Sequence, residues 1–359
     1  MSTRFCVVVG TRPEIIKMSP VIRELDRLGS NYFILHTGQH YSYKMDYIFF
    51  QDLLLPKPKY NLEVGSGLQG EQTGKILTRS EQILKEEKPD IVLVQGDTNT
   101  VLGVALAASK LGLTIGHVEA GLRCYTKGMP EELNRILVDH ISDLLFAPTQ
   151  NAVRNLNKEG IIRNVFCTGN TIVDAVKQNL VISQFNSKIL QDLKLKKDEY
   201  ILATIHRQEN VDNFCNLKEI IDGFKRVGIK TGLLVIFVVH PRTRKMLQEK
   251  NIDTDGILLL EPVGYIDFLS LEASSRLILT DSGGVQEEAC ILHVPCVTVR
   301  QSTERPETVE VGANTIAGID SSKIEIAAQK MMSSERNWKN PFGDGNSAKR
   351  IVHTCLKTL

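Results

Sequence analysis

Three acidic residues in the first half of the chain occupy positions typical of a catalytic site. Asp97 follows the short apolar run at residues 91–94, Glu119 follows a second run at 115–118, and Glu131 comes shortly afterwards. The ends of adjacent parallel strands meet at one edge of a sheet, where ligands bind. Carboxylates gathered there raise one another's pKa values, which makes them candidate acids and bases. Two alternatives stay open: Asp97 could cap the following helix, and Glu131 could be a solvated surface residue.

Two histidines follow apolar runs in the second half of the chain. His206 comes directly after the run at residues 201–205 and is a candidate proton donor to a departing phosphate. His240 follows the run at 233–239 and precedes Pro241. A purely structural role is an equally good interpretation of His240.

The first apolar run ends in Gly10-Thr11-Arg12-Pro13-Glu14. A glycine turn that opens a helix presents unpaired backbone donors and the positive end of the helix dipole. Arg12 and Lys17 add positive charge on the same side, so the segment predicts a diphosphate-binding turn. The alternative is an ordinary strand-to-helix turn with solvated charges. The Ser19-Pro20 pair is expected to kink or restart the helix.

A second candidate anion site lies in the segment 280–288. Ser282, Gly283 and Gly284 follow an apolar run, so their backbone N–H groups can approach a phosphate at a helix start. Glu288, one turn further on, could accept hydrogen bonds from two ribose hydroxyls. A diglycine phosphate turn followed by a carboxylate suits a nucleotide, although Glu287 and Glu288 could instead form a solvated helix face.

A polar loop at residues 303–307 follows the next apolar run. Its Arg305 could clamp a diphosphate with the planar guanidinium fork. Arg300, at the start of the same segment, is the competing candidate for this role.

The sequence contains no pattern for a nicotinamide or a metal. A dinucleotide fingerprint needs three glycines at set spacing after the first strand, and only Gly10 is present. The seven cysteines are scattered and lack paired short spacings, which argues against a zinc site and a disulfide framework. We therefore expect no cofactor and no metal.

Apolar runs alternate with amphipathic stretches along the chain, which predicts an α/β fold of two Rossmann-like, doubly wound parallel sheets. The predicted strands are 5–9, 32–35, 91–94, 115–118, 200–205, 233–239, 257–260, 277–280 and 295–299. A chain of 359 residues exceeds the size of a single core, so we expect two domains with a cleft that binds a nucleotide-diphosphate sugar.

The predicted division gives residues 1–169 to a first domain with the carboxylates and 170–345 to a second, nucleotide-binding domain. A helix is expected at 346–359, packed on one of the two domains. The segments 91–119 and 277–300 read alike, as strand, acidic residue, helix and strand. They are either traces of a duplication or two unrelated units of one common kind.

Overall composition narrows the choice of partners and compartment. The formal net charge of +1 provides no field for nucleic acid or an anionic membrane. No stretch approaches the roughly 20 apolar residues of a membrane span. The start of the chain resembles a first strand and lacks a secretory signal, so we expect a cytoplasmic protein.

Seven motifs resemble those of the non-hydrolysing UDP-N-acetylglucosamine 2-epimerases, in the same order and over nearly the whole chain. They are at residues 10–17, 96–98, 117–123, 130–132, 206–207, 281–288 and 303–307. The resemblance implies a glycosyltransferase-B-like fold with the active site between two Rossmann-type domains, a homodimer, and a C-terminal helix that returns to the first domain.

The resemblance also implies roles for individual residues. The catalytic set would be Asp97, Glu119, Glu131 and His206. The set predicted to hold the UDP portion is Arg12, Lys17, His240, Phe268, Ser282, Gly283, Gly284, Glu288 and Arg305. Gln39 and His40 resemble part of the site where a second UDP-N-acetylglucosamine activates bacterial members.

Three departures from the family pattern bear on these roles. Val263 stands where some relatives have a glutamine that contacts the base, and the segment 124–129 before Glu131 is shorter than in some relatives. Residues 41–44, after the activator motif, also differ from the usual pattern.

The implied reaction interconverts UDP-N-acetylglucosamine and UDP-N-acetylmannosamine by inversion at the second carbon of the sugar. UDP leaves as the proton is removed, which gives a bound 2-acetamidoglucal, and UDP adds back after a proton reaches the opposite face. A glycosyltransferase of the same fold, a hydrolysing epimerase and a silent nucleotide-sugar sensor are the alternatives. The product is expected to serve a surface polysaccharide or a glycoprotein glycan.

Overall fold

The computed structural model describes residues 3–39, 49–125 and 128–358, which form two compact units. Unit 1 comprises Met1–Gln178 and Phe342–Leu359, and unit 2 comprises Asn179–Pro341. The boundary therefore falls within the helix α7 (Thr171–Asn186), some way beyond the expected division at residue 169. The C-terminal segment counts with unit 1.

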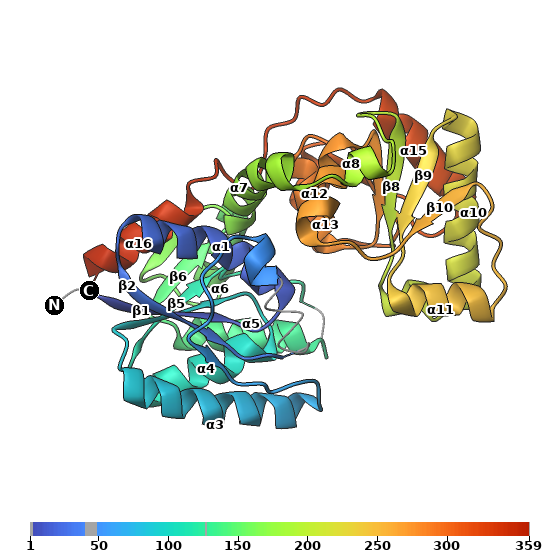
Figure 1. The fold of residues 1–359 in the computed structure, drawn as a ribbon. Helices are drawn as coiled ribbons and strands as arrows, with labels where there is room; N and C mark the ends of the chain where they lie inside the picture. Colours follow the sequence, from blue (N-terminus) through green and yellow to red (C-terminus); the bar gives the residue numbers. More distant parts are fainter. Residues whose placement is uncertain (1–2, 40–48, 126–127, 359) are drawn as a thin grey trace. The chain divides into compact units, whose positions relative to one another are not determined.

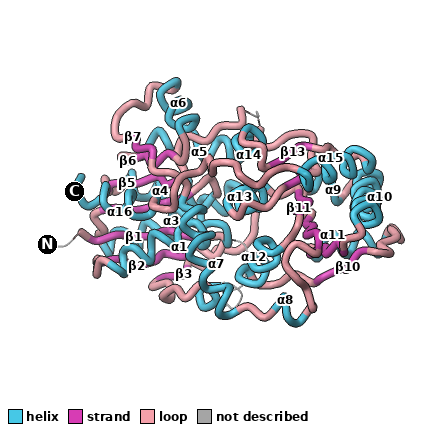
Figure 2. The backbone as a smooth tube through the Cα atoms, turned by 90° about the horizontal axis from the view of Figure 1, so that it is seen from above, coloured by secondary structure: helices cyan, strands magenta, loops and turns pink. Residues whose placement is uncertain are grey.

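Unit 1 contains a parallel sheet in the order β3-β2-β1-β4-β5-β6-β7 (Figure 2). Its strands are β1 (Arg4–Val9), β2 (Asn31–His36), β3 (Tyr60–Asn61), β4 (Ile91–Gln95), β5 (Thr114–Val118), β6 (Leu144–Ala147) and β7 (Val165–Cys167). Its helices, besides α7, are α1 (Arg12–Arg27), α3 (Gln69–Glu87), α4 (Asn99–Lys110), α5 (Pro130–Ile141), α6 (Gln150–Lys158) and α16 (Ser347–Thr358). Helices α1 and α16 lie on one face of the sheet, and α3 and α4 lie on the other (Figure 1).

Unit 2 repeats this plan with the order β10-β9-β8-β11-β12-β13. Its strands are β8 (Tyr200–Thr204), β9 (Leu234–Val238), β10 (Ile257–Leu260), β11 (Leu277–Thr280), β12 (Cys296–Thr298) and β13 (Asn314–Ile316). Its helices are α8 (Ile189–Asp192), α9 (Gln208–Val211), α10 (Phe214–Thr231), α11 (Pro241–Glu249), α12 (Tyr265–Ser274), α13 (Gly283–Ile291), α14 (Pro306–Glu310) and α15 (Ser321–Ser333).

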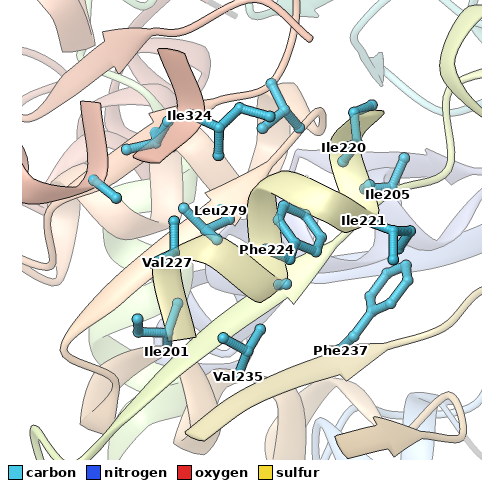
Figure 3. Packing of buried hydrophobic residues seen from close by; sticks show 14 of the residues in the cluster. Ile201, Ile205, Ile220, Ile221, Phe224, Val227, Val235, Phe237, Leu279 and Ile324 are labelled. Carbon is cyan, nitrogen blue, oxygen red and sulfur yellow. The ribbon is translucent and has the colours of Figure 1, made fainter. Parts of the chain in front are cut away.

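The side chains of each unit 2 strand point alternately to the two faces of the sheet, and each face has its own hydrophobic core. On β8, Ile201 and Ala203 pack against α10 and α15, whereas Tyr200 and Leu202 pack against α12 and α13. Successive side chains of a strand point to opposite faces, so a sheet covered on both sides needs continuous apolar runs. In the first of these cores Phe224 meets the ring of Phe237 edge-on, with centroids 5.7 Å apart (Figure 3).

All nine predicted strands are confirmed within one or two residues at either end. Sequence analysis missed the strands β3, β6, β7 and β13. Each is only two to four residues long. Runs that short carry little periodicity, but the predicted β10, β11 and β12 are no longer, so length alone does not separate the missed strands from the predicted ones.

The expected restart of the helix at Ser19-Pro20 is wrong, because α1 continues through Pro20 to Arg27. Proline has no N–H to donate to the carbonyl four residues earlier, which here belongs to Ile16. The Ser19 hydroxyl donates to that carbonyl instead, at 2.8 Å. A serine before the proline thus satisfies the acceptor that would otherwise be left open.

Candidate functional site

In unit 1 the candidate site lies where β1 and β4 are neighbours in the sheet. The helices that follow these strands, α1 and α4, cover opposite faces of the sheet, and ligands bind at such a point. Gly10 follows β1, and any side chain there would collide with the hydroxyls of Thr37 and Thr100. Close packing therefore requires the glycine of this turn.

Glu14 ties this turn to the segment after β4. Its carboxylate accepts the backbone N–H groups of Gly10 at 2.5 Å and Thr11 at 2.9 Å, which forms a capping box at the start of α1. The Thr98 hydroxyl donates to its other oxygen. Burial raises the pKa of Glu14 to about 7, with a further contribution from the charge of Asp97. Arg12, in the same turn, lies 5.6 Å from the ring of Phe49.

Glu119 is the most constrained of the predicted catalytic residues. It is 7% exposed and has a φ of 71°, in the left-handed region that a residue with a long side chain rarely occupies. Its carboxylate lies 2.6 Å from Lys17 Nζ and accepts further hydrogen bonds from Gln95 and Asn170. Such backbone strain in a buried, paired carboxylate is typical of functional positions.

Asp97 faces Arg135 of α5, with 2.5 Å between Oδ2 and Nη2. Its side chain is 32% exposed, so the carboxylate remains within reach of a ligand. The alternative role as a helix cap is wrong, because the N-cap residue of α4 is Thr98. Asn134, also on α5, donates to the backbone carbonyl of Asp97 at 2.9 Å, so α5 holds both the side chain and the backbone of Asp97.

Glu131 lies at the start of α5 and lines a polar pocket of about 180 Å³. The other lining residues are Gln39, Ser66, Gly67, Gln69, Gln72, Thr98, Asn99, Pro130 and Asn134. Gln39 is held there by Thr100, whose amide and hydroxyl donate to its Oε1 at 3.0 Å and 2.6 Å. His40, the second residue of the predicted activator motif, lies outside the described residues.

A buried ionic network lies beneath these carboxylates. His117 Nδ1 is 2.6 Å from Asp139, and its Nε2 is 2.8 Å from the carbonyl of Gly96, the residue before Asp97. Asp139 also lies 2.7 Å from Arg123. Burial alone would raise the pKa of Asp139, but the charges and hydrogen bonds of His117 and Arg123 lower it overall. The network thus holds an ionised aspartate that anchors the backbone beside the site.

In unit 2 the equivalent edge holds His206 and Asp281, which follow the adjacent strands β8 and β11. His206 Nδ1 lies 3.2 Å from Asp281 Oδ1, and the amide of Arg207 and the side chain of Asn210 donate to the same carboxylate at 3.0 Å. Burial would raise the pKa of Asp281, but these hydrogen bonds lower it. The buried Asp281 carboxylate orients the imidazole of His206 through Nδ1, and the imidazole remains 43% exposed to solvent.

The predicted phosphate turn opens the nine-residue helix α13. Ser282 is the N-cap, and its hydroxyl accepts the amide of Val285. Side chains built at Gly283 and Gly284 would find no protein atom closer than 3.8 Å and 3.9 Å. Packing within unit 2 therefore does not require either glycine, in contrast to Gly10.

The two arginines proposed for the diphosphate differ in their partners. Arg300 forms a double hydrogen bond to Glu304, at 2.7 Å and 2.9 Å. Arg305, the N-cap residue of α14, donates from Nε to Glu287 at 2.7 Å. A solvated helix face is the wrong interpretation of Glu287 and Glu288, which are 1% and 6% exposed.

The remaining predicted nucleotide residues also lie in unit 2. The buried Tyr265 hydroxyl donates to Glu288 at 2.9 Å. Phe268, one helical turn further along α12, packs partly buried against the core on that face of the sheet. His240 caps α11 by accepting the amide of Arg242 at 3.3 Å, which supports the structural interpretation of that histidine.

Sequence analysis missed the supporting residues Gln95, Arg135, Asp139 and Tyr265. Gln95 directly follows the predicted strand at 91–94 and could have been noticed, because a polar residue closing an apolar run faces the same edge as Asp97. The other three lie on helices, where nothing in the local pattern distinguishes them from surface positions.

Within the described ranges no group of three or more histidine, cysteine, aspartate or glutamate side chains could hold a metal ion. All seven cysteines are free, and four of them are buried. None of the helices in the described part of the chain is long and apolar enough to cross a membrane.

Comparison with known proteins identifies the family. The model of the UDP-N-acetylglucosamine 2-epimerase family matches residues 23–356. The chain belongs to this family. A UDP-N-acetylglucosamine 2-epimerase of Methanocaldococcus jannaschii is 54% identical over 357 residues, which cover 97% of this chain and 98% of that protein.

A solved structure matches the fold of this chain, and a further relative is named for a different nucleotide sugar. The crystal structure of the Methanocaldococcus jannaschii UDP-GlcNAc 2-epimerase in complex with UDP-GlcNAc and UDP matches with a TM-score of 0.90 and 53% identity, covering 99% of this chain and 100% of that chain. A UDP-2,3-diacetamido-2,3-dideoxy-D-glucuronate 2-epimerase of Pseudomonas aeruginosa is 38% identical, covering 99% of both proteins. The predicted α/β, glycosyltransferase-B-like fold with two doubly wound units is confirmed.

Proposed function

We propose that the chain interconverts UDP-N-acetylglucosamine and UDP-N-acetylmannosamine without hydrolysing the nucleotide sugar. The single observation that carries this proposal is Glu119, a buried, strained carboxylate paired with Lys17 beside the more open Asp97. Carboxylates held in two such environments are suited to proton removal and proton delivery. The family membership and the 54% identity to an archaeal 2-epimerase support the same substrate.

The proposed reaction needs no oxidant and no net water. A carboxylate removes the proton at the second carbon, and the C–H electron pair forms a double bond to the first carbon. The bond from the first carbon to the UDP oxygen breaks, and its electron pair leaves with UDP. Proton delivery to the opposite face of the second carbon and return of UDP to the first carbon give the epimer.

The unit 1 residues supply the proton chemistry in this proposal. Lys17 and Gln95 orient the Glu119 carboxylate through an ion pair and a hydrogen bond. Asp97 is oriented by Arg135 and keeps about a third of its side chain exposed. With Glu131 in the adjoining pocket, these groups share the acid and base roles on the two faces of the sugar.

The unit 2 residues supply binding and leaving-group stabilisation. The start of α13 at Ser282, Gly283 and Gly284 offers backbone donors and a positive dipole end to a diphosphate. Arg305 adds charge, and His206, oriented by Asp281, donates a proton to the departing UDP. Glu288 accepts hydrogen bonds from the ribose hydroxyls.

Two further features belong to the proposal. The active enzyme is a homodimer, as the family resemblance implies. A second UDP-N-acetylglucosamine, which contacts Gln39, activates the enzyme. A strictly hyperbolic rate curve without a lag in the mannose-to-glucose direction would contradict activation.

The test is to incubate the protein with UDP-N-acetylglucosamine in heavy water and to follow the sugar by proton NMR. The expected product is UDP-N-acetylmannosamine with deuterium at its second carbon. Free N-acetylmannosamine would show a hydrolysing epimerase, and an unchanged sugar would indicate a glycosyltransferase or a sensor. The same experiment with UDP-2,3-diacetamido-2,3-dideoxy-D-glucuronate would separate the two substrates that relatives use.

A further inference from the structure

One carboxyl group of unit 2 has no place in the reaction described above. Glu272, on α12, is 0% exposed, and neither of its carboxyl oxygens meets a hydrogen-bond donor among the described residues. Removing an ionised carboxylate from water without a partner costs several kcal/mol. Buried polar groups are nearly always hydrogen-bonded, so this one requires an explanation.

The titratable groups around Glu272 include no cation in the described part of the chain. They are Tyr265 on α12, the helix of Glu272 itself, Glu288 on α13, Tyr200 on β8 and Cys296 on β12. Both tyrosine hydroxyls donate elsewhere, Tyr265 to Glu288 at 2.9 Å and Tyr200 to a backbone carbonyl at 2.5 Å. Burial raises the pKa of the Cys296 thiol, so the sulfur stays uncharged. Nothing here neutralises a negative Glu272.

Glu288 is the neighbour within hydrogen-bonding reach of Glu272. Two ionised carboxylates cannot hydrogen-bond each other, because both only accept. A protonated carboxyl group can donate to an ionised one, and bonds of this kind are short and strong. A single proton between the two side chains therefore gives the protonated oxygen of Glu272 a partner and removes its charge.

We propose that Glu272 is a neutral carboxylic acid whose hydroxyl donates to Glu288 and thereby positions Glu288 for the ribose of the nucleotide. This inference rests on the proposed function, which assigns Glu288 to the ribose. Together with the Tyr265 hydroxyl, the Glu272 hydroxyl fixes the orientation of a carboxylate that is only 6% exposed. Glu272 is thus a positioning residue that acts through Glu288.

The arrangement makes nucleotide binding sensitive to alkaline pH. Burial raises the pKa of Glu272 well above its ordinary value, and the charge of Glu288 raises it further. When Glu272 loses its proton, Glu288 loses a donor and gains a negative neighbour. Affinity for UDP should then fall as the pH rises.

The test measures UDP binding by titration calorimetry at pH 7, 8 and 9 for the wild type, Glu272→Gln and Glu272→Met. The glutamine amide donates but does not ionise, so Glu272→Gln should match the wild type at pH 7 and bind more tightly at pH 9. Glu272→Met lacks the donor and should bind about tenfold more weakly at every pH, the effect of losing a hydrogen bond to a charged group. The uridine ring titrates equally in all three proteins and cancels.

Tyr265→Phe is the matched control, because it removes the other donor to Glu288 and no titrating carboxyl group. It should weaken UDP binding by a similar factor and leave the alkaline decline of the wild type in place. An identical decline in the wild type and in Glu272→Gln would overturn the inference. That comparison stands even if Glu272→Met fails to fold.

Glu288→Gln separates this inference from the proposed function. If Glu288→Gln binds UDP as tightly as the wild type, the assignment of Glu288 to the ribose is wrong. If it binds weakly while neither Glu272 variant differs from the wild type, the ribose assignment stands and the positioning role of Glu272 is wrong.

Discussion

The two units place an aspartate at the same point of the same topology and give it different surroundings. Asp97 follows β4 and Asp281 follows β11, the strands that occupy equivalent positions in the two sheet orders. The side chain of Asp97 is 32% exposed beside Arg135, whereas that of Asp281 is 0% exposed and is bound by the His206 loop. Strand order thus decides where a carboxylate lies, and burial and partners decide what it does.

The largest effect is expected for Asp97→Asn. If Asp97 takes part in proton transfer, this change should lower kcat by about 10² to 10⁴-fold while UDP still binds. The measurement is the rate of UDP-N-acetylmannosamine formation together with UDP titration calorimetry. Near-normal turnover would show that the more exposed aspartate is not the catalytic one.

A smaller loss is expected for Asp281→Asn, because this residue acts through His206. Losing one charged acceptor of several hydrogen bonds should lower kcat by about 10 to 100-fold. The rate of UDP-N-acetylmannosamine formation gives kcat, and UDP titration calorimetry should show that the variant still binds UDP. A loss of UDP binding as large as the loss of kcat would reduce Asp281 to a structural residue.

The glycines of the two units offer a third test. Gly283→Ala should weaken UDP binding by about tenfold, because a methyl group blocks close backbone approach, and should slightly raise the melting temperature, because alanine favours a helix. Gly10→Ala is the matched control and should lower the melting temperature, since its methyl group collides with Thr37 and Thr100. Equal losses of stability would erase this difference between the units.

The prediction for Glu14→Gln concerns stability and its dependence on pH. The folded-state pKa of Glu14, about 7, lies above the unfolded value of 4.5. Its protonated form stabilises the fold fully below pH 4.5, and this contribution is lost as the pH rises to 7. The free energy of unfolding of the wild type, relative to Glu14→Gln, should therefore fall by at most about 3 kcal/mol across this range. Urea unfolding at pH 4.5, 6 and 7.5 measures it, and a flat difference would contradict the assignment.

The sequence predicted the parts of the fold and site that depend on local pattern. Continuous apolar runs marked the long central strands, and acidic residues after them marked the sheet edge. The segments 91–119 and 277–300 occupy equivalent places in the two sheets. The contacts of Arg135, Asp139 and Glu272 depend on helices meeting across long stretches of chain, which no local pattern encodes.

The left-handed backbone at Glu119 limits which substitutions this position can accept during evolution. A glycine there would relieve roughly 1–3 kcal/mol of strain, but it would leave Lys17 buried without its carboxylate, which costs about 3–5 kcal/mol. Loss of either residue alone is therefore disfavoured even where the chemistry is no longer needed. Descendants of this fold that abandon epimerisation should lose the two residues together, and then become more stable than their ancestor.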